Sequence, residues 1–251
     1  MRSNAGEWLL PENQMRRNII RISVVAFGAL VALACPICPR AQVDKARYPK
    51  MAPLDQYLIA DEKAEIALAR SAAPASISDK ADVMVLRRDG YATAVKGSNG
   101  FVCMVERSWA NTTDNAEFWN PRIRAPHCFN SAAVSSFLPF FLMKTKLVLE
   151  GKSRAEIAAA MASTLEKKEL PQLAPETMVY MMSKQQYLND RGMSWHPHIM
   201  FYVAGNAEKS RGANLPDSPV MAAYDPEQRV TTFFVLVPEW SDGTPGPSMA
   251  Q

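Results

Sequence analysis

Apolar residues recur in short β-type runs at 83–86, 91–95 and 101–107. The first run is continuously apolar, which is typical of a strand that is covered on both faces. An Asp-Gly pair at 89–90 and a Gly-Ser-Asn-Gly stretch at 97–100 separate the runs. Both stretches are strong turn formers, because glycine adopts a positive φ without a steric clash. The pattern predicts three strands joined by tight turns.

A helical period replaces this pattern at 54–70, 136–149 and 153–168. Apolar residues there recur every three or four positions, so each helix has one apolar face. Ser153 and Glu156 form the capping-box pattern at the start of the third helix. We expect the second and third helices to form a hairpin that covers one side of the sheet.

Further strand-like runs follow at 178–182, 195–203 and 230–237, and the last is almost entirely apolar. Polar stretches at 108–130 and 206–226 are predicted to be loops. Together these elements predict the α+β class. We expect a single domain in which an antiparallel sheet is covered by a helical hairpin and an N-terminal helix.

The beginning of the chain has the features of an export signal. Positively charged residues within 15–21 precede a short apolar stretch at 22–34 that ends in a small-x-small pattern. The apolar stretch is shorter than the roughly 20 residues that a membrane-spanning helix needs. We therefore predict a signal peptide region over residues 1–41, with Met15 as an alternative start.

Cleavage of this signal is expected between Ala34 and Gln42, which would place the mature protein in the periplasm or outside the cell. Lipidation of Cys35 is the alternative to simple cleavage. We expect membrane association only through an uncleaved signal or through a lipidated Cys35. The remaining boundaries are a flexible leader at 42–52, the domain at 53–240 and a disordered tail at 241–251.

The net charge of +3 comes from the signal region. That region contains five arginines and two acidic residues, so the chain from residue 42 onward holds 23 basic and 23 acidic residues. A balance of this kind gives no basic surface for nucleic acid, and no nucleic-acid-binding motif is visible. We expect no nucleic-acid partner.

Cysteine usage supports export. Cleavage near residue 41 removes Cys35 and Cys38 and leaves only Cys103 and Cys128. In an oxidising compartment these two are expected to form a disulfide. Alternation along 101–107 places Cys103 on the core face of its strand. The alternative is two independent thiols.

Three histidines are the only constellation that suggests catalysis. His196 and His198 are two residues apart on a predicted strand, so both point to one face, and Ile199, Phe201 and Val203 are expected to face the core. A disulfide at Cys128 would bring the neighbouring His127 toward the sheet. Three imidazoles with one open position could hold a catalytic zinc ion. The alternative is that the histidines serve structural roles.

Other chemistry is not indicated. The sequence has no nucleophile elbow, P-loop, His-Glu-x-x-His motif or dinucleotide-binding glycine fingerprint. Trp109, Trp119 and Tyr202 could line a ligand-binding cleft, although aromatic lids over a core are the more common arrangement. Apart from the zinc of the alternative site, no cofactor is predicted.

The stretch Gly-Ser-Asn-Gly-Phe-Val-Cys-Met-Val-Glu-Arg at 97–107, followed by a second cysteine at Cys128, resembles a group of uncharacterised secreted bacterial proteins. The resemblance extends from about residue 64 to residue 237. It implies export and a single domain, and it implies no catalytic residue.

These observations favour an exported protein of the periplasm or envelope that acts as a binding or structural module without catalysis. The alternative function is a zinc-dependent, hydrolase-like enzyme that uses His127, His196 and His198. A small-ligand binder with Trp109, Trp119 and Tyr202 around a cleft is a third hypothesis.

Overall fold

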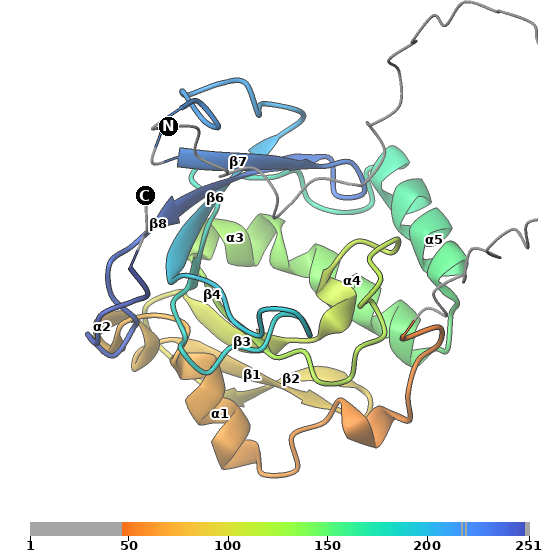
Figure 1. The fold of residues 1–251 in the computed structure, drawn as a ribbon. Coiled ribbons are helices and arrows are strands. Elements are labelled where there is room, and N and C mark those ends of the chain that lie inside the picture. Colours follow the sequence, from red (N-terminus) through yellow and green to blue (C-terminus); the bar gives the residue numbers. More distant parts are fainter. Residues whose placement is uncertain (1–46, 217, 219, 249–251) are drawn as a thin grey trace, which may run out of the picture. The chain divides into compact units, whose positions relative to one another are not determined.

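The strand-like runs of the sequence pair into one eight-stranded sheet (Figure 1). The computed structural model describes residues 47–216, 218 and 220–248. The strands lie in the order β2-β1-β3-β4-β5-β6-β8-β7. All neighbours are antiparallel except β1 and β3, so the sheet is mixed. The strands are β1 (Asp82–Arg87), β2 (Gly90–Val95), β3 (Val102–Glu106), β4 (Ala125–Phe129), β5 (Met178–Met181), β6 (His198–Ala204), β7 (Val220–Asp225) and β8 (Val230–Leu236).

Five α-helices and two short 3-10 helices complete the domain. They are η1 (Leu54–Gln56), α1 (Glu62–Arg70), α2 (Ala75–Ser78), η2 (Ser108–Ala110), α3 (Ser131–Ser136), α4 (Leu138–Leu149) and α5 (Arg154–Glu166). The capping box of α5 is confirmed, because Ser153 and Glu156 bond each other's backbone N–H. The helix expected over 54–70 is divided. Tyr57 lies between its two parts, fully buried, and its hydroxyl donates to the Trp119 carbonyl at 2.8 Å.

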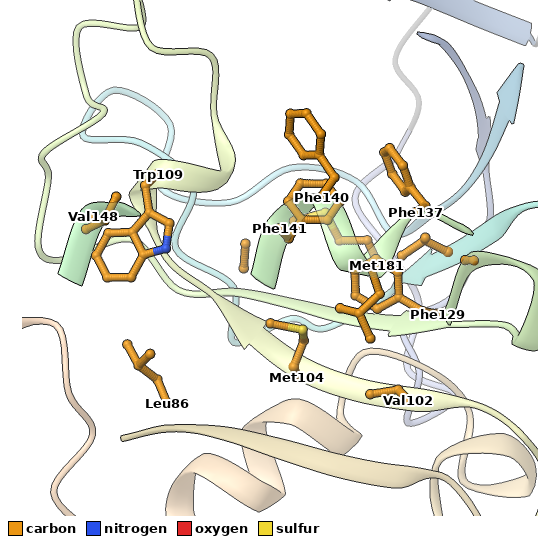
Figure 2. Close-up of a cluster of buried hydrophobic side chains, with 14 of the residues drawn as sticks. Leu86, Val102, Met104, Trp109, Phe129, Phe137, Phe140, Phe141, Val148 and Met181 are labelled. Atoms are coloured by element: carbon orange, nitrogen blue, oxygen red, sulfur yellow. The ribbon is translucent and has the colours of Figure 1, made fainter. Parts of the chain in front are cut away.

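The sheet lies between α1 on one face and α3 and α4 on the other (Figure 1). Figure 2 shows the larger core, in which Phe137, Phe140 and Phe141 lie over Met104 and Phe129 of the sheet. A smaller core between α1 and the sheet includes Cys103, Val105 and Cys128. Helices therefore cover both faces, but the cover differs from the expected hairpin, because α3 and α4 lie on the sheet and α5 packs on α4. This accounts for the complete burial of β3 and β4.

The sheet curves around α4. At one end α4 contacts β2, and at the other its Lys144 ammonium group reaches the turn between β7 and β8. Lys144 is completely buried and donates to the Glu227 carboxylate and, at 2.8 Å, to the Asn111 carbonyl. Burial lowers the pKa of Lys144, and the charge of Glu227 opposes this effect. The pair fixes the β7–β8 turn to α4.

The expected orientation of β6 is wrong. Its helix-facing side chains are His198, at 1% exposed, and Met200, whereas Phe201 on the opposite face is 41% exposed. The alternation is confirmed, but the side of β6 with more aliphatic residues is not the buried side. Helices α3 and α4 cover the face that carries His198, while α1 covers β1, β3 and β4 and leaves the outer face of β6 without a helix.

Two strands lie in stretches that the sequence predicted as loops. β4 contains Pro126, which has no N–H for a ladder, and β7 contains two alanines and an aspartate, which have low strand propensity. The outer edge of β7 is partly paired by the preceding loop, because the Asn214 side chain donates to the Ala222 carbonyl at 2.8 Å and accepts from its N–H at 2.9 Å. This amide takes the place that a neighbouring strand would occupy.

Both ends of the described chain contact the domain. Residues 47–52 belong to the expected leader, and Tyr48, Met51 and Ala52 pack against the larger core. At the other end the Ser241 hydroxyl donates to the Ser71 carbonyl at 2.6 Å. The predicted signal region, the start of the leader and the last three residues lie outside the described residues.

No helix in the described part of the chain is long and apolar enough to cross a membrane.

Candidate functional site

The Cys103–Cys128 disulfide is present in the structure. The two residues are direct partners in the β3–β4 ladder, so the antiparallel pairing brings their side chains together on one face. Both are completely buried beneath α1. The bond closes the chain over 25 positions and stabilises the ends of the long segment between β3 and β4.

His127 is part of a buried polar pair. Its Nδ1–H donates to the Ala125 carbonyl at 3.1 Å, and Nδ1 lies 3.0 Å from Oε2 of Glu106. The second oxygen of Glu106 is buried without a partner in the described structure. The imidazole is thereby oriented by the end of β3.

His198 lies two strands away on the same helix-facing side. Its Nδ1 is 2.7 Å from the His196 carbonyl, and Trp195 stacks edge-on against its ring at 4.6 Å. Burial lowers the pKa of His198 to about 4, the His196 carbonyl opposes the shift, and the His127 and His196 imidazoles add to it. His198 is therefore neutral at pH 7 and serves in packing.

The three histidines do not form a metal site. All three lie among the described residues, and there no group of three or more His, Cys, Asp or Glu side chains could hold a metal ion. His127 and His198 use Nδ1 for internal hydrogen bonds, and the His196 ring lies against Trp195. The arrangement provides no support for zinc chemistry.

Acid is expected to destabilise the domain through His198. The folded-state pKa of about 4 lies below the ordinary value of 6.5, so between these values the unfolded chain binds more protons. The free energy of unfolding should therefore decrease as the pH falls from 6.5 to 4, by on the order of 3 kcal/mol in total. Urea unfolding at a series of pH values measures this decrease.

The variant His198→Asn provides the control for this measurement. An asparagine amide can still donate to the His196 carbonyl but does not titrate. The variant should lose most of the pH dependence between 6.5 and 4. An equal slope in both proteins would show that other groups cause the acid effect.

The aromatic residues predicted to line a cleft are part of the core. Trp109 and Trp119 are buried, and the Trp109 indole N–H donates to the Thr145 hydroxyl at 2.9 Å. Tyr202 packs against Phe137 with ring centroids 4.3 Å apart. The three rings have different neighbours, and each of them packs in the core.

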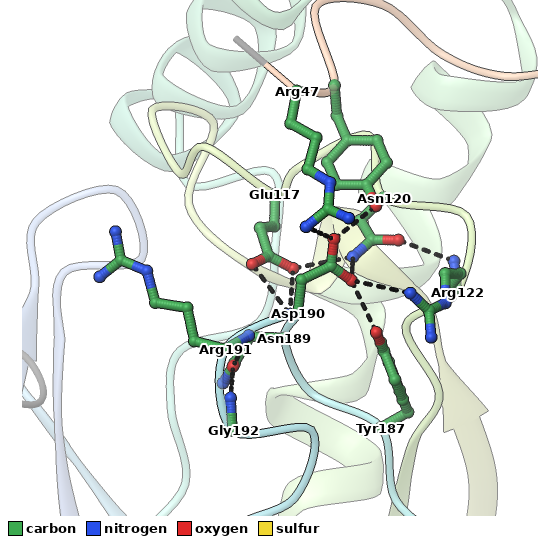
Figure 3. Close-up of polar contacts among 10 residues, drawn as sticks. Arg47, Glu117, Asn120, Arg122, Tyr187, Asn189, Asp190, Arg191 and Gly192 are labelled. Carbon is green, nitrogen blue, oxygen red and sulfur yellow. Dashed lines mark hydrogen bonds and ion pairs between the residues drawn. The ribbon is translucent and has the colours of Figure 1, made fainter. Parts of the chain in front are cut away.

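Asp190 is the centre of the densest polar network in the described structure (Figure 3). Its side chain is only 5% exposed. Five side chains donate to its two oxygens or pair with them: Arg47, Tyr48, Asn120, Arg122 and Tyr187. The Asp190 backbone N–H in turn donates to Glu117 at 3.0 Å. The network joins the N-terminal arm, residues 47–52, to the loop before β4 and to the loop between β5 and β6.

Burial raises the pKa of Asp190, but the hydrogen bonds from Tyr187, Tyr48 and Asn120 and the charge of Arg47 outweigh burial and lower the pKa to about 2. The carboxylate is therefore ionised at any physiological pH. Tyr48 and Tyr187 donate to it at 2.7 and 2.6 Å. Saturation with internal donors indicates a structural role for this carboxylate.

Replacing Asp190 with asparagine should destabilise the domain by about 2 kcal/mol, because charge-assisted hydrogen bonds become neutral and one acceptor becomes a donor. The arm at 47–52 should also become more accessible, which limited proteolysis near Tyr48 would detect.

Arg122→Ala is the matched control. Arg122 is largely exposed and 3.5 Å from the same carboxylate, so its loss should change the stability by less than about 0.5 kcal/mol. Unchanged proteolysis in Asp190→Asn would contradict the role of the network.

A cleft lies between the segment that leads into α1 and the end of β1. Its volume is about 300 Å³. Leu58, Ile59 and Ala60 line it from the segment before α1, and β1 lines it at Val85 and Leu86, whose side chains are almost fully buried on opposite faces of the strand. The apolar side-chain surface of the cleft therefore comes mainly from the segment before α1, and Glu62, Glu65, Arg87 and Arg88 make up the rest of its lining with β1.

The base of this cleft carries a buried ion pair. Glu65 lines the cleft and is 1% exposed, and Arg107 behind it is completely buried. Arg107 Nη2 donates to Glu65 Oε1 at 2.9 Å, and Arg107 Nε donates to the Tyr57 carbonyl at 2.6 Å. The Leu86 N–H also donates to Glu65 Oε1, at 3.0 Å. This arrangement fixes the Glu65 carboxylate between β1 and α1.

The rim of the cleft is charged but balanced. Arg87 pairs with Glu62 at 3.0 Å, and Arg88 pairs with Asp55. All four side chains are at least about half exposed, so each pair contributes little to stability. The rim adds no net charge to the site.

Sequence reasoning did not identify this cleft. The sequence predicts a helix with Leu58 and Ile59 on its apolar face and Glu62 and Glu65 on its solvated face, and the prediction for Glu65 is wrong, because this side chain is 1% exposed. Arg107 directly follows a strand of core residues. A basic residue at such a position indicates that a buried carboxylate is needed to balance its charge.

Comparisons of this chain with protein-family models, curated proteins and solved structures find no match. The resemblance to secreted bacterial proteins therefore stays a prediction.

Proposed function

We propose that this protein is an exported binding module that takes a small ligand into the cleft between α1 and β1. The observation that carries the proposal is the cleft itself, which is lined by apolar side chains of the segment before α1, by β1 and by the fixed carboxylate of Glu65. Pockets of this kind, apolar with a few fixed polar groups, are the usual form of small-ligand sites.

The use of the other chemically active side chains supports binding over catalysis. His127, His198, Trp109 and Asp190 all make internal contacts that orient loops or complete the core. Glu65 differs from them, because it is a fixed polar group that borders a cavity.

Export is supported by two features. The signal-like pattern within residues 15–34 precedes the domain, and the domain contains a buried disulfide. Disulfides form and persist mainly in oxidising compartments. We place the mature protein in the periplasm or outside the cell.

Protein-observed NMR with a mixed panel of small aromatic and aliphatic compounds tests the binding role. The methyl groups of Leu58, Ile59, Val85 and Leu86 should shift together on addition of the panel. Shifts that cluster on another surface, or no shifts at millimolar compound, would contradict the proposal. A methyl of Val203, on the opposite half of the sheet, serves as the unperturbed reference.

A separate experiment tests export. Residues 1–52 fused to a phosphatase that is active only outside the cytosol should give an active enzyme, and deletion of 22–34 should abolish the activity. Mass spectrometry of the mature chain should show a start between Ala34 and Gln42 and an oxidised Cys103–Cys128 pair. Recovery of the intact leader with reduced thiols would refute export and leave the binding test unaffected.

A further inference from the structure

The two edges of the sheet differ. At one edge, the Asn214 amide bonds both main-chain groups of Ala222 in β7. The other edge is β2, whose one partner strand is β1. In the part of the chain that the structure describes, no other element pairs with the outer side of β2. An open strand edge is a template for pairing with another extended segment.

The register of the β1–β2 hairpin shows which main-chain groups of β2 point outward. In an antiparallel pair, opposite residues alternate between those that exchange hydrogen bonds and those whose N–H and C=O groups point away from each other. Leu86 and Tyr91 are opposite, and the Leu86 N–H donates to Glu65 instead of to β2. Tyr91 and, two residues later, Thr93 therefore direct their N–H and C=O groups toward the open edge.

β2 lacks most of the features that protect an edge. Its sequence Gly-Tyr-Ala-Thr-Ala-Val contains no charged residue and no proline. Its register with β1 shifts only after Thr93, so the stretch 90–93 is regular. The Tyr91 hydroxyl donates to the Val105 carbonyl at 2.8 Å, which fixes this stretch to the sheet. The edge is therefore held in place, and its Thr93 is exposed.

The two ends of β2 carry opposite charges. Asp89, in the turn before the strand, is exposed and forms no ion pair with a described residue. Lys96, directly after the strand, pairs with Asp82 at 3.0 Å, but its side chain is 80% exposed. Arg88 in the same turn as Asp89 is balanced by Asp55. An antiparallel partner with the same end charges is attracted at both ends, and a second copy of this chain is such a partner.

We propose that this protein forms a symmetric dimer in which β2 pairs antiparallel with the β2 of a second copy. About a two-fold axis at Ala92, Tyr91 of each copy lies opposite Thr93 of the other, and each such pair exchanges both of its hydrogen bonds. The small side chain of Ala92 allows the strands to approach on the axis. Asp89 of each copy lies beside Lys96 of the other.

The pairing closes at two copies. It joins the two sheets into one, and the β7 edges at its ends are occupied by the Asn214 amide. An interface that uses the same surface on both copies leaves no free surface of that kind for a third. The chain after the predicted signal region carries no net charge, so the two copies do not repel each other. The dimer does not depend on the proposed ligand cleft.

Sedimentation equilibrium of the purified, oxidised full chain tests the dimer. One strand pair buries little surface, so we expect a weak dimer with a Kd on the order of 10–100 μM. The mean molar mass should rise to twice the monomer value across this range, with no larger species. Amide hydrogen exchange should slow at Tyr91 and Thr93 as the concentration rises. The Ala92 N–H, which points to β1, is the reference.

Three variants of Thr93 locate the interface. Thr93→Pro removes an outward N–H and leaves the β1–β2 ladder intact, and Thr93→Lys places a charge on each side of the axis. Each should weaken the dimer at least about tenfold. Thr93→Val retains the N–H and a high strand propensity, so it is the matched control and should dimerise like the original protein.

The end charges provide a second test. Asp89→Lys should weaken the dimer about threefold, because the new lysine meets Lys96 of the other copy. Adding Lys96→Glu to this variant should restore the original Kd.

A concentration-dependent dimer that is lost in Thr93→Pro and Thr93→Lys but not in Thr93→Val supports the proposal. Since Thr93 is exposed, Thr93→Lys retains the test if the proline variant does not fold. A chain that is monomeric at every concentration overturns the proposal. A dimer that Thr93→Lys leaves unchanged also overturns it, because that dimer uses another surface.

Discussion

Replacing Arg107 with methionine is expected to reduce the free energy of unfolding by about 3–5 kcal/mol. The Arg107 side chain is 0% exposed and donates to the carbonyls of Tyr57 and Val105 and to the Glu65 carboxylate. Methionine can fill much of the space but supplies no donor. Glu65 would then be a buried anion with only the Leu86 N–H as a partner, and uncompensated buried charge is among the costliest changes in a core.

Urea unfolding of the oxidised protein measures this effect. The matched control is Arg87→Met, because Arg87 pairs with Glu62 at a similar distance but at the surface, and its loss should cost about 0.5 kcal/mol or less. The double variant Arg107→Met with Glu65→Leu should recover part of the stability, since it removes both charges. A single variant within 1 kcal/mol of the original protein would mean that water or local rearrangement compensates Glu65.

Loss of the disulfide is the second large effect that we expect. The closed loop of Cys103 and Cys128 spans a sequence separation of 25, for which the chain-entropy model gives about 3.5 kcal/mol. The Cys103→Ala, Cys128→Ala variant should therefore unfold at a lower urea concentration. The midpoint should decrease by this free energy divided by the m-value. The loss is large against the total stability of about 5–15 kcal/mol of a typical domain.

The control for the disulfide is the original protein after reduction, in which the bridge is open but both cysteine side chains are still present. Its stability should fall by a similar amount, whereas reductant should leave the stability of the alanine variant unchanged. If the Cys103→Ala, Cys128→Ala variant is as stable as the oxidised protein, then β3–β4 pairing alone holds these strands and the bridge has little effect on the unfolded chain.

Local features were predictable from the sequence because they depend on neighbouring residues. The glycine turns near 90 and 97–100, the capping box of α5 and the buried strand β8 follow from turn chemistry, capping and continuous apolar sequence. The cysteine count predicted the disulfide correctly. The α+β class and a sheet with helical cover are also confirmed, although one strand pair, β1 and β3, is parallel.

Features that depend on distant contacts were not predictable. The Asp190 network joins Tyr48 to a residue 142 positions away, and its turn was visible only as Asn-Asp-Arg-Gly. Which face of β6 is buried depends on where α3 and α4 pack, and alternation alone does not determine it. The cleft likewise exists only because β1 and the segment before α1 lie side by side, with Glu65 and Arg107 paired between them.

The Asn214 amide at the outer edge of β7 has a consequence for behaviour in solution. Because it already bonds both main-chain groups of Ala222, a strand from another molecule finds no free donor or acceptor at the middle of this edge. The β7 edge is therefore a poor template for edge-to-edge pairing with a second molecule.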